Sequence, residues 1–449
     1  MCPGDRIARP TRAHAVAKTG RAGGSAAERG MDNPAAPVQP RAMDADVLIA
    51  GGGLNGPALA LALAQGGLRV TVVDARPAPA REQPGFDGRA YALAIASRRL
   101  LSAIGIWGGV AAKAQPIMRI EVTDGRVPGP PSPLFLAFDA AEIEEGPMGH
   151  MLEDRFLYAA FLAAMRAEPR ITLLPGESVV AQEAGAAGVT VVLASGGRLA
   201  ARALVGCDGR GSGVAARAGI GRITHRYGQT ALVTALHHEG DHRGTAHEYF
   251  LPAGPFAILP LAGGHHSSIV WCERHADAEA IDALPDADYL VALRARFGDF
   301  LGPLTLAGPR FRYPLSLSLA ERFVAARVAL VGDAAHGVHP VAGQGLNLGL
   351  RDVGALAEVL VRAHRRGEDI GSAGVLDEYQ RWRRFDATAL SLGMDALVRL
   401  FSNDDPLLRL GRDLGIGAVN RIAPLRRRFI RQAAGLTGAL PRLLAGRPI

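Results

Sequence analysis

The residue types best suited to chemistry in this chain are glycines and carboxylates that directly follow short apolar runs. Gly51, Gly53 and Gly56 fit the pattern G-x-G-x-x-G after the apolar run 46–50. In this pattern the first glycine permits a tight turn, the second lets the backbone approach a pyrophosphate, and the third allows close helix–strand packing. Asp74 follows 18 residues after Gly56, where a carboxylate can bind ribose hydroxyls. The pattern predicts a dinucleotide site. Alone it does not separate FAD from NAD, and a glycine turn without a ligand is the alternative.

Two further motifs place an aspartate and a glycine after an apolar run. Asp208 and Gly209 follow one such run, and Gly332 and Asp333 follow another. An aspartate in this position is presented at the carboxyl end of a strand, where open α/β sheets bind their ligands. A nicotinamide dehydrogenase needs neither motif. Their presence therefore favours a flavin as the bound dinucleotide.

The elements that must position these motifs begin with a strand, a helix and a second strand. Residues 46–50 and 70–74 are expected to form buried strands, and the alanine- and leucine-rich run after Pro57 is expected to form the helix between them. Such a βαβ unit implies a parallel sheet. From 223 to 320, short alternating runs punctuated by glycine and proline predict a mostly antiparallel sheet. The run 328–331 predicts a return to the first sheet.

Charge and composition exclude several classes of protein. The formal net charge is +7, but residues 1–43 carry +4 and residues 414–449 carry +7, so the rest of the chain sums to −4. A continuous basic groove for nucleic acid is therefore not expected. Three cysteines are too few for a disulfide framework. No apolar run approaches the ~20 residues of a membrane-spanning helix. We expect a soluble or peripherally bound intracellular protein.

The combination of motifs resembles the group A flavoprotein monooxygenases, which are aromatic hydroxylases related to p-hydroxybenzoate hydroxylase. A narrower resemblance is to the ubiquinone-biosynthesis hydroxylases. It is carried by HPVAGQGLN at 339–347, GPFAILPL at 254–261, YPL at 313–315 and DGRAYAL at 87–93. The resemblance extends from about residue 45 to residue 400. It implies FAD as the cofactor and NAD(P)H as a transient co-substrate.

The resemblance also implies roles for individual residues. Asp333 resembles the carboxylate that binds the ribityl chain of FAD, and Arg155 resembles the arginine that reaches the pyrophosphate. Asp154 stands where the family more often has asparagine, a departure expected to weaken the FAD contact. The remaining implied positions are Asp208 and Gly209 for FAD and the pyridine nucleotide, Arg89 near the flavin, Gly332 beside Asp333, Pro340 in the reaction pocket, and Gly345, Leu346 and Asn347, whose backbone N–H groups face the flavin pyrimidine edge.

The predicted fold class is α/β, with a Rossmann-like FAD-binding domain, an inserted and mostly antiparallel substrate domain, and a C-terminal helical region. The predicted division is a disordered extension at 1–43, the first part of the FAD-binding domain with small substrate-side segments at 44–222, the β-rich substrate domain at 223–320, the second part of the FAD-binding domain at 321–400, and a basic helical region at 401–449.

The function that the resemblance implies is hydroxylation of the aromatic ring of a polyprenylated phenol in ubiquinone biosynthesis. Reduced flavin reacts with O2 to give a C4a-hydroperoxide, whose distal oxygen is transferred to the ring. The protein must hold the ring near the flavin and exclude water, so no obligatory acid–base pair is expected. Two alternatives stay open: a hydroxylase of a soluble aromatic compound, and a non-catalytic FAD-binding scaffold of a lipid-biosynthesis complex.

Three further expectations concern the surroundings of the site. Tyr249, Phe250 and Phe256 alternate along the predicted insert sheet and either face the substrate or pack in the core. His336 and His339 are expected to fix loop geometry, and no metal site is expected. The basic segment 421–431 is expected to contact anionic lipid or a partner of a ubiquinone-biosynthesis complex. This contact would place the protein in the bacterial cytoplasm, peripherally on the inner face of the plasma membrane.

Overall fold

The predicted βαβ unit is present in the computed structural model. It consists of β1 (Ala45–Ala50), α1 (Asn55–Gln65) and β2 (Val70–Asp74). The structure describes residues 43–77, 89–125, 135–340, 343–401, 415 and 417–449. Nine of the eleven residues of α1 are buried, because it packs against both β2 and α8 (Gln344–Arg365).

The first sheet continues this unit as a parallel sheet. Its order is β18-β19-β11-β1-β2-β8, and only β18 in this path runs antiparallel to its neighbour. A hairpin of β9 and β10 extends it beside β11. The bounds are β8 Ile171–Pro175, β9 Val179–Ala184, β10 Val189–Leu193, β11 Arg198–Gly206, β18 Val324–Ala325 and β19 Val328–Leu330. The run 328–331 therefore returns to the sheet as predicted.

The second sheet has the order β20-β17-β12-β15-β14-β13-β5-β6, with β16 paired to β12. All of its pairs are antiparallel except β13 with β5. Its strands are β5 Arg119–Asp124, β6 Phe135–Asp139, β12 Arg222–His238, β13 Thr245–Leu251, β14 Gly254–Pro260, β15 His266–Arg274, β16 Leu304–Leu306, β17 Phe311–Ala320 and β20 His336–Gly337. Two strands, β5 and β6, thus come from a part of the chain far before residue 223.

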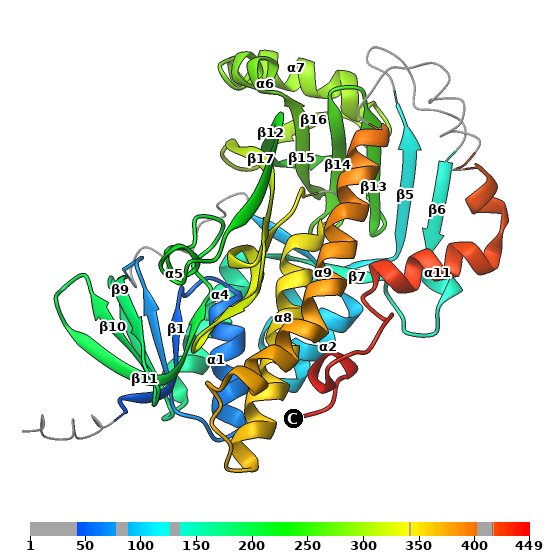
Figure 1. Ribbon diagram of the computed structural model, residues 1–449. Coiled ribbons are helices and arrows are strands. Elements are labelled where there is room, and N and C mark those ends of the chain that lie inside the picture. The colour runs from blue at the N-terminus through cyan, green and yellow to red at the C-terminus, as the bar shows by residue number, and fades with distance from the viewer. Residues whose placement is uncertain (1–42, 78–88, 126–134, 341–342, 402–414, 416) are drawn as a thin grey trace, which may run out of the picture. The chain divides into compact units, whose positions relative to one another are not determined.

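Helices α6 (His275–Asp282) and α7 (Asp286–Phe297) cover one face of the second sheet (Figure 1). The core beneath them contains Trp271, Phe256 and Tyr289, all fully buried. The opposite face of the sheet is turned toward the aspartate of the third motif and the start of α8.

A small third sheet, β3-β7-β4, lies next to the helices that follow the first βαβ unit. Strand β7 ends at Glu153, and helix α4 begins at the next residue, Asp154. The bounds are β3 Ala90–Ala94, β4 Gln115–Ile117, β7 Gly149–Glu153, α2 Ile95–Ala103, α3 Trp107–Val110, α4 Asp154–Ala167 and α5 Gly213–Arg217.

The described residues from 373 to 433 are largely helical, as predicted. Helix α9 (Ala373–Phe401) packs along α8, and α11 (Ala423–Ala433) follows (Figure 1). No described helix is both long and apolar enough to cross a bilayer. The predicted extension 1–43 lies outside the described residues except for Met43, and the domain boundaries at 222, 320 and 400 stay a prediction.

Candidate functional site

Three motifs that are far apart in the sequence meet at one edge of the first sheet. Ala50, Gly206 and Leu330 are register neighbours at the carboxyl ends of β1, β11 and β19. The next residues continue this alignment, since the backbone N–H of Cys207 donates to Ala50 O (2.7 Å) and that of Val331 donates to Gly206 O (3.0 Å). The residues that follow each strand, including Gly51, Asp208 and Asp333, therefore leave the sheet side by side.

The glycines of the first motif differ in what surrounds them. Gly51 has φ +110°, and a Cβ there would lie 2.3 Å from Cys207 O. A Cβ at Gly56 would lie 2.0 Å from Gly51 O, so only glycine permits this close approach of helix and turn. At Gly53 a Cβ would meet no described atom within 4 Å. The loop thus presents open backbone at Gly53, as a pyrophosphate requires.

Asp74 lies against the same turn. A Cβ on Gly52 would come within 2.6 Å of Asp74 Oδ2, and the backbone N–H of Arg76 donates to Asp74 Oδ1 over 3.2 Å. The carboxylate is therefore held beside the glycine loop, at the position from which it would bind a ribose.

Two buried oxygens near these motifs have no hydrogen-bond partner among the described residues, namely Asp208 Oδ1 and Asn55 Oδ1. The other Asp208 oxygen accepts from the Val214 N–H over 3.0 Å. The amide of Asn55 lies against both Gly332 and Gly349. A Cβ on Gly332 would lie 2.2 Å from Asn55 Nδ2, and a Cβ on Gly349 would lie 2.4 Å from it. Asn55 therefore joins the first motif to the third, and unpaired buried oxygens beside a loop are consistent with a ligand that completes them.

Two arginines hold the loop around Asp333: Arg210, which directly follows Gly209 of the second motif, and Arg222, which lies outside the motifs. Arg210 Nε donates to Asp333 Oδ2 over 3.2 Å, and its Nη2 donates to Val338 O over 3.0 Å. Arg222 donates to the backbone oxygens of Asp333 and Ala334. Burial lowers the pKa of the Arg222 guanidinium.

A buried charge network fixes the turn before Asp333. Asp352 Oδ2 accepts from the Gly332 N–H (3.0 Å) and lies 2.5 Å from His336 Nε2, while Arg383 Nε donates to Oδ1 over 2.7 Å. Burial alone would raise the pKa of Asp352, but His336 and Arg383 hold it below its usual value. The expected role of His336 in loop geometry is consistent with this contact.

The first turn of α8 faces the same space. Gly343, at φ +61°, precedes the helix, and the Asn347 side chain ties that turn to the β3–α2 junction. Asn347 Oδ1 accepts from the Ala94 N–H (2.9 Å) and the Ser97 hydroxyl (2.7 Å), and Nδ2 donates to Ala92 O (2.8 Å). Because the Asn347 side chain is committed to these bonds, Asn347 can offer a ligand only its backbone N–H.

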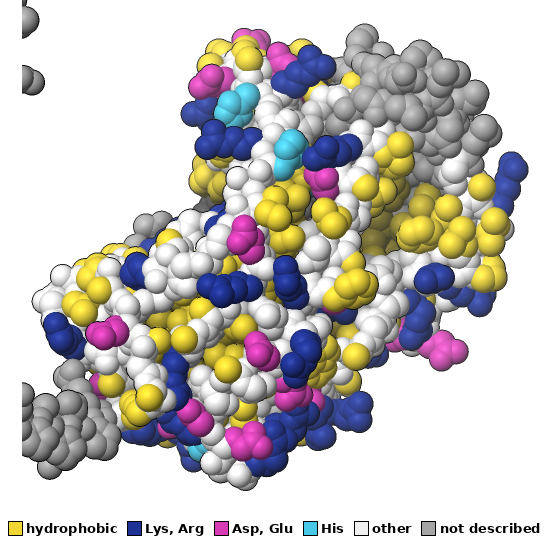
Figure 2. All heavy atoms as spheres, viewed as in Figure 1, with side chains coloured by type: hydrophobic (Ala, Val, Ile, Leu, Met, Phe, Trp, Pro, Cys, Tyr) yellow, Lys and Arg dark blue, Asp and Glu magenta, His cyan; other side chains and the backbone are white. Residues whose placement is uncertain are grey.

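A cavity of about 1040 Å³ extends from this turn to the second sheet. Its lining is largely apolar and includes Asp333, Pro340, Gly345, Leu346 and Asn347 on the flavin side, Ile120, Val122, Leu136, Phe138, Ala246, Ala257 and Val270 on the sheet, and Leu397, Leu400, Phe401, Phe429 and Ile430 on α9 and α11. Figure 2 shows hydrophobic side chains gathered around a hollow on the side where these helices and strands meet.

The alternating aromatic residues of the insert divide between two faces. Phe250 lines the cavity and stacks on Phe401 with ring centroids 4.1 Å apart. Tyr249 and Phe256 stack on the other face and pack toward Trp271. One of the three therefore faces the cavity, and the other two belong to the core.

Arg89 and Arg155 are not among the described residues that line this cavity. Arg89 Nη2 lies 2.8 Å from Asp154 Oδ2, and Arg155 Nε lies 2.7 Å from Glu153 Oε2. The Arg155 guanidinium also stacks 4.5 Å from the Phe156 ring centroid. Asp154, the departure from the family pattern, is thus paired with Arg89.

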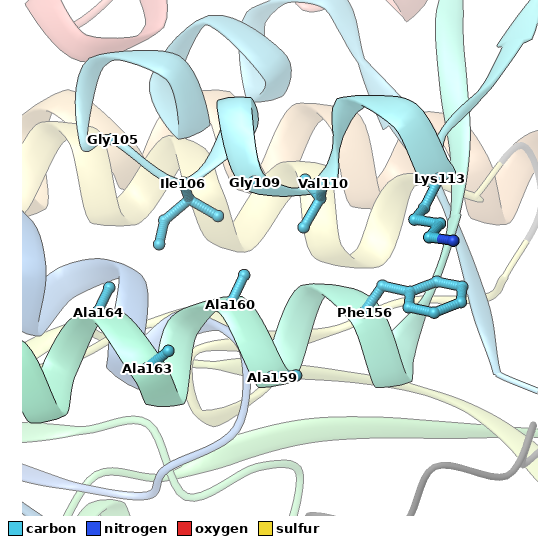
Figure 3. A pocket seen from close by; sticks show the side chains of 10 residues that line it. All are labelled: Gly105, Ile106, Gly109, Val110, Lys113, Phe156, Ala159, Ala160, Ala163 and Ala164. Atoms are coloured by element: carbon cyan, nitrogen blue, oxygen red, sulfur yellow. The ribbon is translucent and has the colours of Figure 1, made fainter.

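A second hollow of about 410 Å³ lies between α3 and α4. Figure 3 shows Ile106 and Val110 opposite the alanines of α4, with Lys113 near the Phe156 ring. The Lys113 ammonium lies 5.6 Å from that ring centroid. None of the glycine motifs contributes to this lining, so the hollow lacks groups that would hold a dinucleotide.

Comparisons with known proteins agree with this geometry. The family described as FAD binding domain matches residues 44–391. The chain is 50% identical over 408 residues to a protein named ubiquinone hydroxylase UbiL from Rhodospirillum rubrum, covering 90% of this chain and 94% of that one. It is 37% identical over 396 residues to 3-demethoxyubiquinol 3-hydroxylase of Escherichia coli, covering 87% and 98%. The crystal structure of p-nitrophenol 4-monooxygenase PnpA from Pseudomonas putida shares the fold, with a TM-score of 0.72, 20% identity and coverage of 88% and 98%.

Gly53→Ala and Gly56→Ala are expected to fail in different ways. A methyl at Gly53 meets only the space that a pyrophosphate would use, so the apoprotein should keep its urea midpoint while binding FAD at least about tenfold more weakly. A methyl at Gly56 meets Gly51 O, so the apoprotein itself should lose about 1–3 kcal/mol of stability. Urea unfolding and titration with FAD measure the two effects. Unchanged FAD affinity in Gly53→Ala would contradict this placement of the pyrophosphate.

Arg383→Met should destabilise the protein by about 3–5 kcal/mol, because it removes a partner of a buried carboxylate. The double variant Arg383→Met/Asp352→Asn should recover part of this loss. Asp352 has a folded-state pKa below its unfolded value of about 3.9, so its contribution is present at neutral pH and is lost as the pH falls below about 4. Urea unfolding at pH 7 and at pH 3 or below tests both points. An Arg383→Met protein as stable as the wild type would disprove the network's role.

Proposed function

The chain belongs to the ubiquinone-biosynthesis hydroxylases within the FAD-dependent aromatic monooxygenases, and from this premise we propose the reaction that it catalyses. The protein is an FAD-dependent monooxygenase that hydroxylates the aromatic ring of a polyprenylated phenol in ubiquinone biosynthesis, with NAD(P)H and O2 as co-substrates. The observation that carries the proposal is the shared wall of Asp333, Pro340 and the first turn of α8, which belongs both to the flavin motifs and to a large apolar cavity.

The residues present fit FAD. Gly51, Gly53 and Gly56 would hold the pyrophosphate, Asp74 the ribose, and Asp333 with Gly332 the ribityl chain. Asp208 and Gly209 would serve FAD and the pyridine nucleotide. Arg155 would reach the pyrophosphate when it exchanges Glu153 for phosphate, and Arg89 would neutralise Asp154 beside it. When bound and reduced, FAD would activate O2, so that one oxygen atom of O2 becomes electrophilic enough to react with the aromatic ring.

The chain's own residues would position the aromatic ring, stabilise negative charge on the flavin and exclude water. The N–H groups of Gly345, Leu346 and Asn347 are at the positive end of α8 and would stabilise negative charge on the flavin edge. Pro340 lines the cavity at this end. The apolar walls hold an aromatic ring there and exclude water from the reacting oxygen.

The cavity also favours a lipid-like phenol over a small soluble aromatic compound. Its volume of about 1040 Å³ exceeds what one aromatic ring and the flavin edge fill, and its far wall includes the apolar side chains of Val122, Leu136, Phe250 and Phe401. A prenyl chain matches that wall by simple burial of apolar area. A scaffold without activity would need no such cavity beside its cofactor.

We further propose that α11 holds the protein at the cytoplasmic face of the bacterial plasma membrane, where a polyprenylated phenol resides. Arg426 and Arg431 are paired with Glu142 and Glu145, so they attach the helix to the body of the protein. Arg427 and Arg428 are exposed and would bind an anionic lipid surface. The exposed Ile422 and Phe429 beside them would insert into the interface. Partners in a biosynthetic complex would approach the same face.

Reaction of the holoprotein with NAD(P)H and 2-geranylphenol under 18O2 should give a hydroxylated product with one heavy oxygen atom. Ala257→Phe should lower this rate roughly tenfold or more while leaving FAD bound, because the ring fills the cavity. Mass spectrometry of the product and the flavin absorbance measure the two effects.

Ala163→Phe is the matched control, since it places the same ring in the second hollow. It should leave the rate near that of the wild type. Holoprotein that oxidises NAD(P)H but yields no labelled product would contradict the proposed hydroxylation, and an equal loss of rate in both variants would contradict its assignment to the large cavity.

Arg427→Glu/Arg428→Glu should weaken binding to vesicles of equimolar phosphatidylglycerol and phosphatidylcholine by roughly tenfold per reversed charge. The exposed pair Arg170→Glu/Arg198→Glu has the same change in net charge and lies away from α11, so it should have little effect. Vesicle sedimentation measures both. If the two double variants bind equally well, α11 does not contact the membrane.

A further inference from the structure

One carboxylate stands in the apolar wall of the large cavity. On the second sheet, Glu248 is the register partner of Val122 on β5 and of Ala257 on β14. The same row continues to Leu136 on β6 and Val270 on β15. All five residues line the cavity, and four of them are apolar. The strand pattern therefore exposes a single acidic side chain in the middle of a hydrophobic surface.

Glu248 is also close to the flavin side of the cavity along its strand. Ala246, two residues earlier on the same face, belongs to the apolar cluster that includes Ala92. Ala92 in turn accepts the Asn347 hydrogen bond and lies against Gly343 at the start of α8. Two residues of extended strand span about 7 Å. Glu248 thus lies about 7 Å along β13 from Ala246, whose apolar cluster includes a residue beside the first turn of α8.

The Glu248 carboxyl receives no hydrogen bond or ion pair from the described part of the chain. The side chain is half-buried, and it belongs to the cavity lining. Burial raises its pKa to about 8. Cys272, on the same face, has a thiol pKa raised by its own burial and then by Glu248. At neutral pH the group is therefore mostly an uncharged carboxylic acid.

A neutral carboxylic acid donates one hydrogen bond and accepts others, which matches a phenol hydroxyl. In a pocket lined by apolar groups, a single placed polar group fixes the orientation of the ligand. A half-buried carboxyl in an apolar wall, without a partner among the described residues, is a hydrogen-bonding group available to a ligand. Resting on the proposed function, we propose that the Glu248 carboxyl binds the phenol hydroxyl of the substrate and thereby decides which ring carbon faces the flavin.

The test compares two ligands of the FAD-loaded protein at pH 7, 2-geranylphenol and geranylbenzene, which differ by the hydroxyl. Perturbation of the flavin absorbance gives the affinity for each. Wild-type protein should prefer the phenol by about tenfold, the scale of one hydrogen bond made in a dry site. Glu248→Met keeps the approximate volume but has no matching donor, so the preference should fall to near unity, with geranylbenzene bound as tightly as before or more tightly.

Glu248→Gln is the second variant, because its amide keeps a donor and an acceptor. It should retain most of the phenol preference and the position of hydroxylation, whereas Glu248→Met should oxidise NAD(P)H with less product or with a changed isomer ratio. An undiminished preference in Glu248→Met would overturn the proposal, as would a Gln variant that discriminates no better than the Met variant. Wild-type protein that prefers the phenol yet forms no product would instead contradict the proposed function, so the two failures are distinguishable.

Discussion

The alignment of three strand ends is the constraint on which the rest of the site depends. Because β1, β11 and β19 end at one level, the glycine loop, Asp208 and Asp333 emerge together from motifs that are separated by more than a hundred residues. The alignment is maintained by the backbone hydrogen bonds between the strands and by Asp352. The Asp352 carboxylate accepts a hydrogen bond from the Gly332 N–H and another from the Arg383 guanidinium. A buried carboxylate with several partners can fix a turn in this way, whereas one left unpaired would destabilise it.

The second sheet forms one wall of the cavity that lies beside this edge of the first sheet. Its covered face packs around Trp271 under α6 and α7, which makes the sheet a rigid wall, and its other face remains open toward the first turn of α8. Helices α9 and α11 add apolar side chains to the far side of the same space. Binding of the cofactor, exclusion of water and burial of a prenyl chain therefore depend on the packing of one cavity. In our proposal, the exposed Arg427 and Arg428 of α11 would place that cavity next to a membrane surface.

The sequence predicts the nucleotide-binding half well because each of its signals is local. The turn at Gly51, the helix after Pro57 and the strand at 328–331 depend on residues that are neighbours in the chain. The contacts that complete the site are not local. Arg383 reaches Asp352 from another helix, and β5 joins β13 in parallel from a distant segment. No spacing rule predicts such pairings.

Glu248 is an intermediate case, since its strand did contain a signal. In the run TAHEYFL the period of two places it between Ala246 and Phe250, so a carboxyl group falls on an apolar face. The pattern identifies the anomaly, but only the register with Val122 and Ala257 shows that this face lines a cavity and not a packed core.

The central claim is that one cavity holds the flavin edge and the phenol ring together. A crystal structure of the protein with FAD and 2-geranylphenol tests it most directly. The account predicts the flavin ring against Pro340 and the first turn of α8, and the phenol between that ring and the wall of β13 and β14. A flavin ring placed away from α8, or a phenol bound in the hollow between α3 and α4, would contradict it.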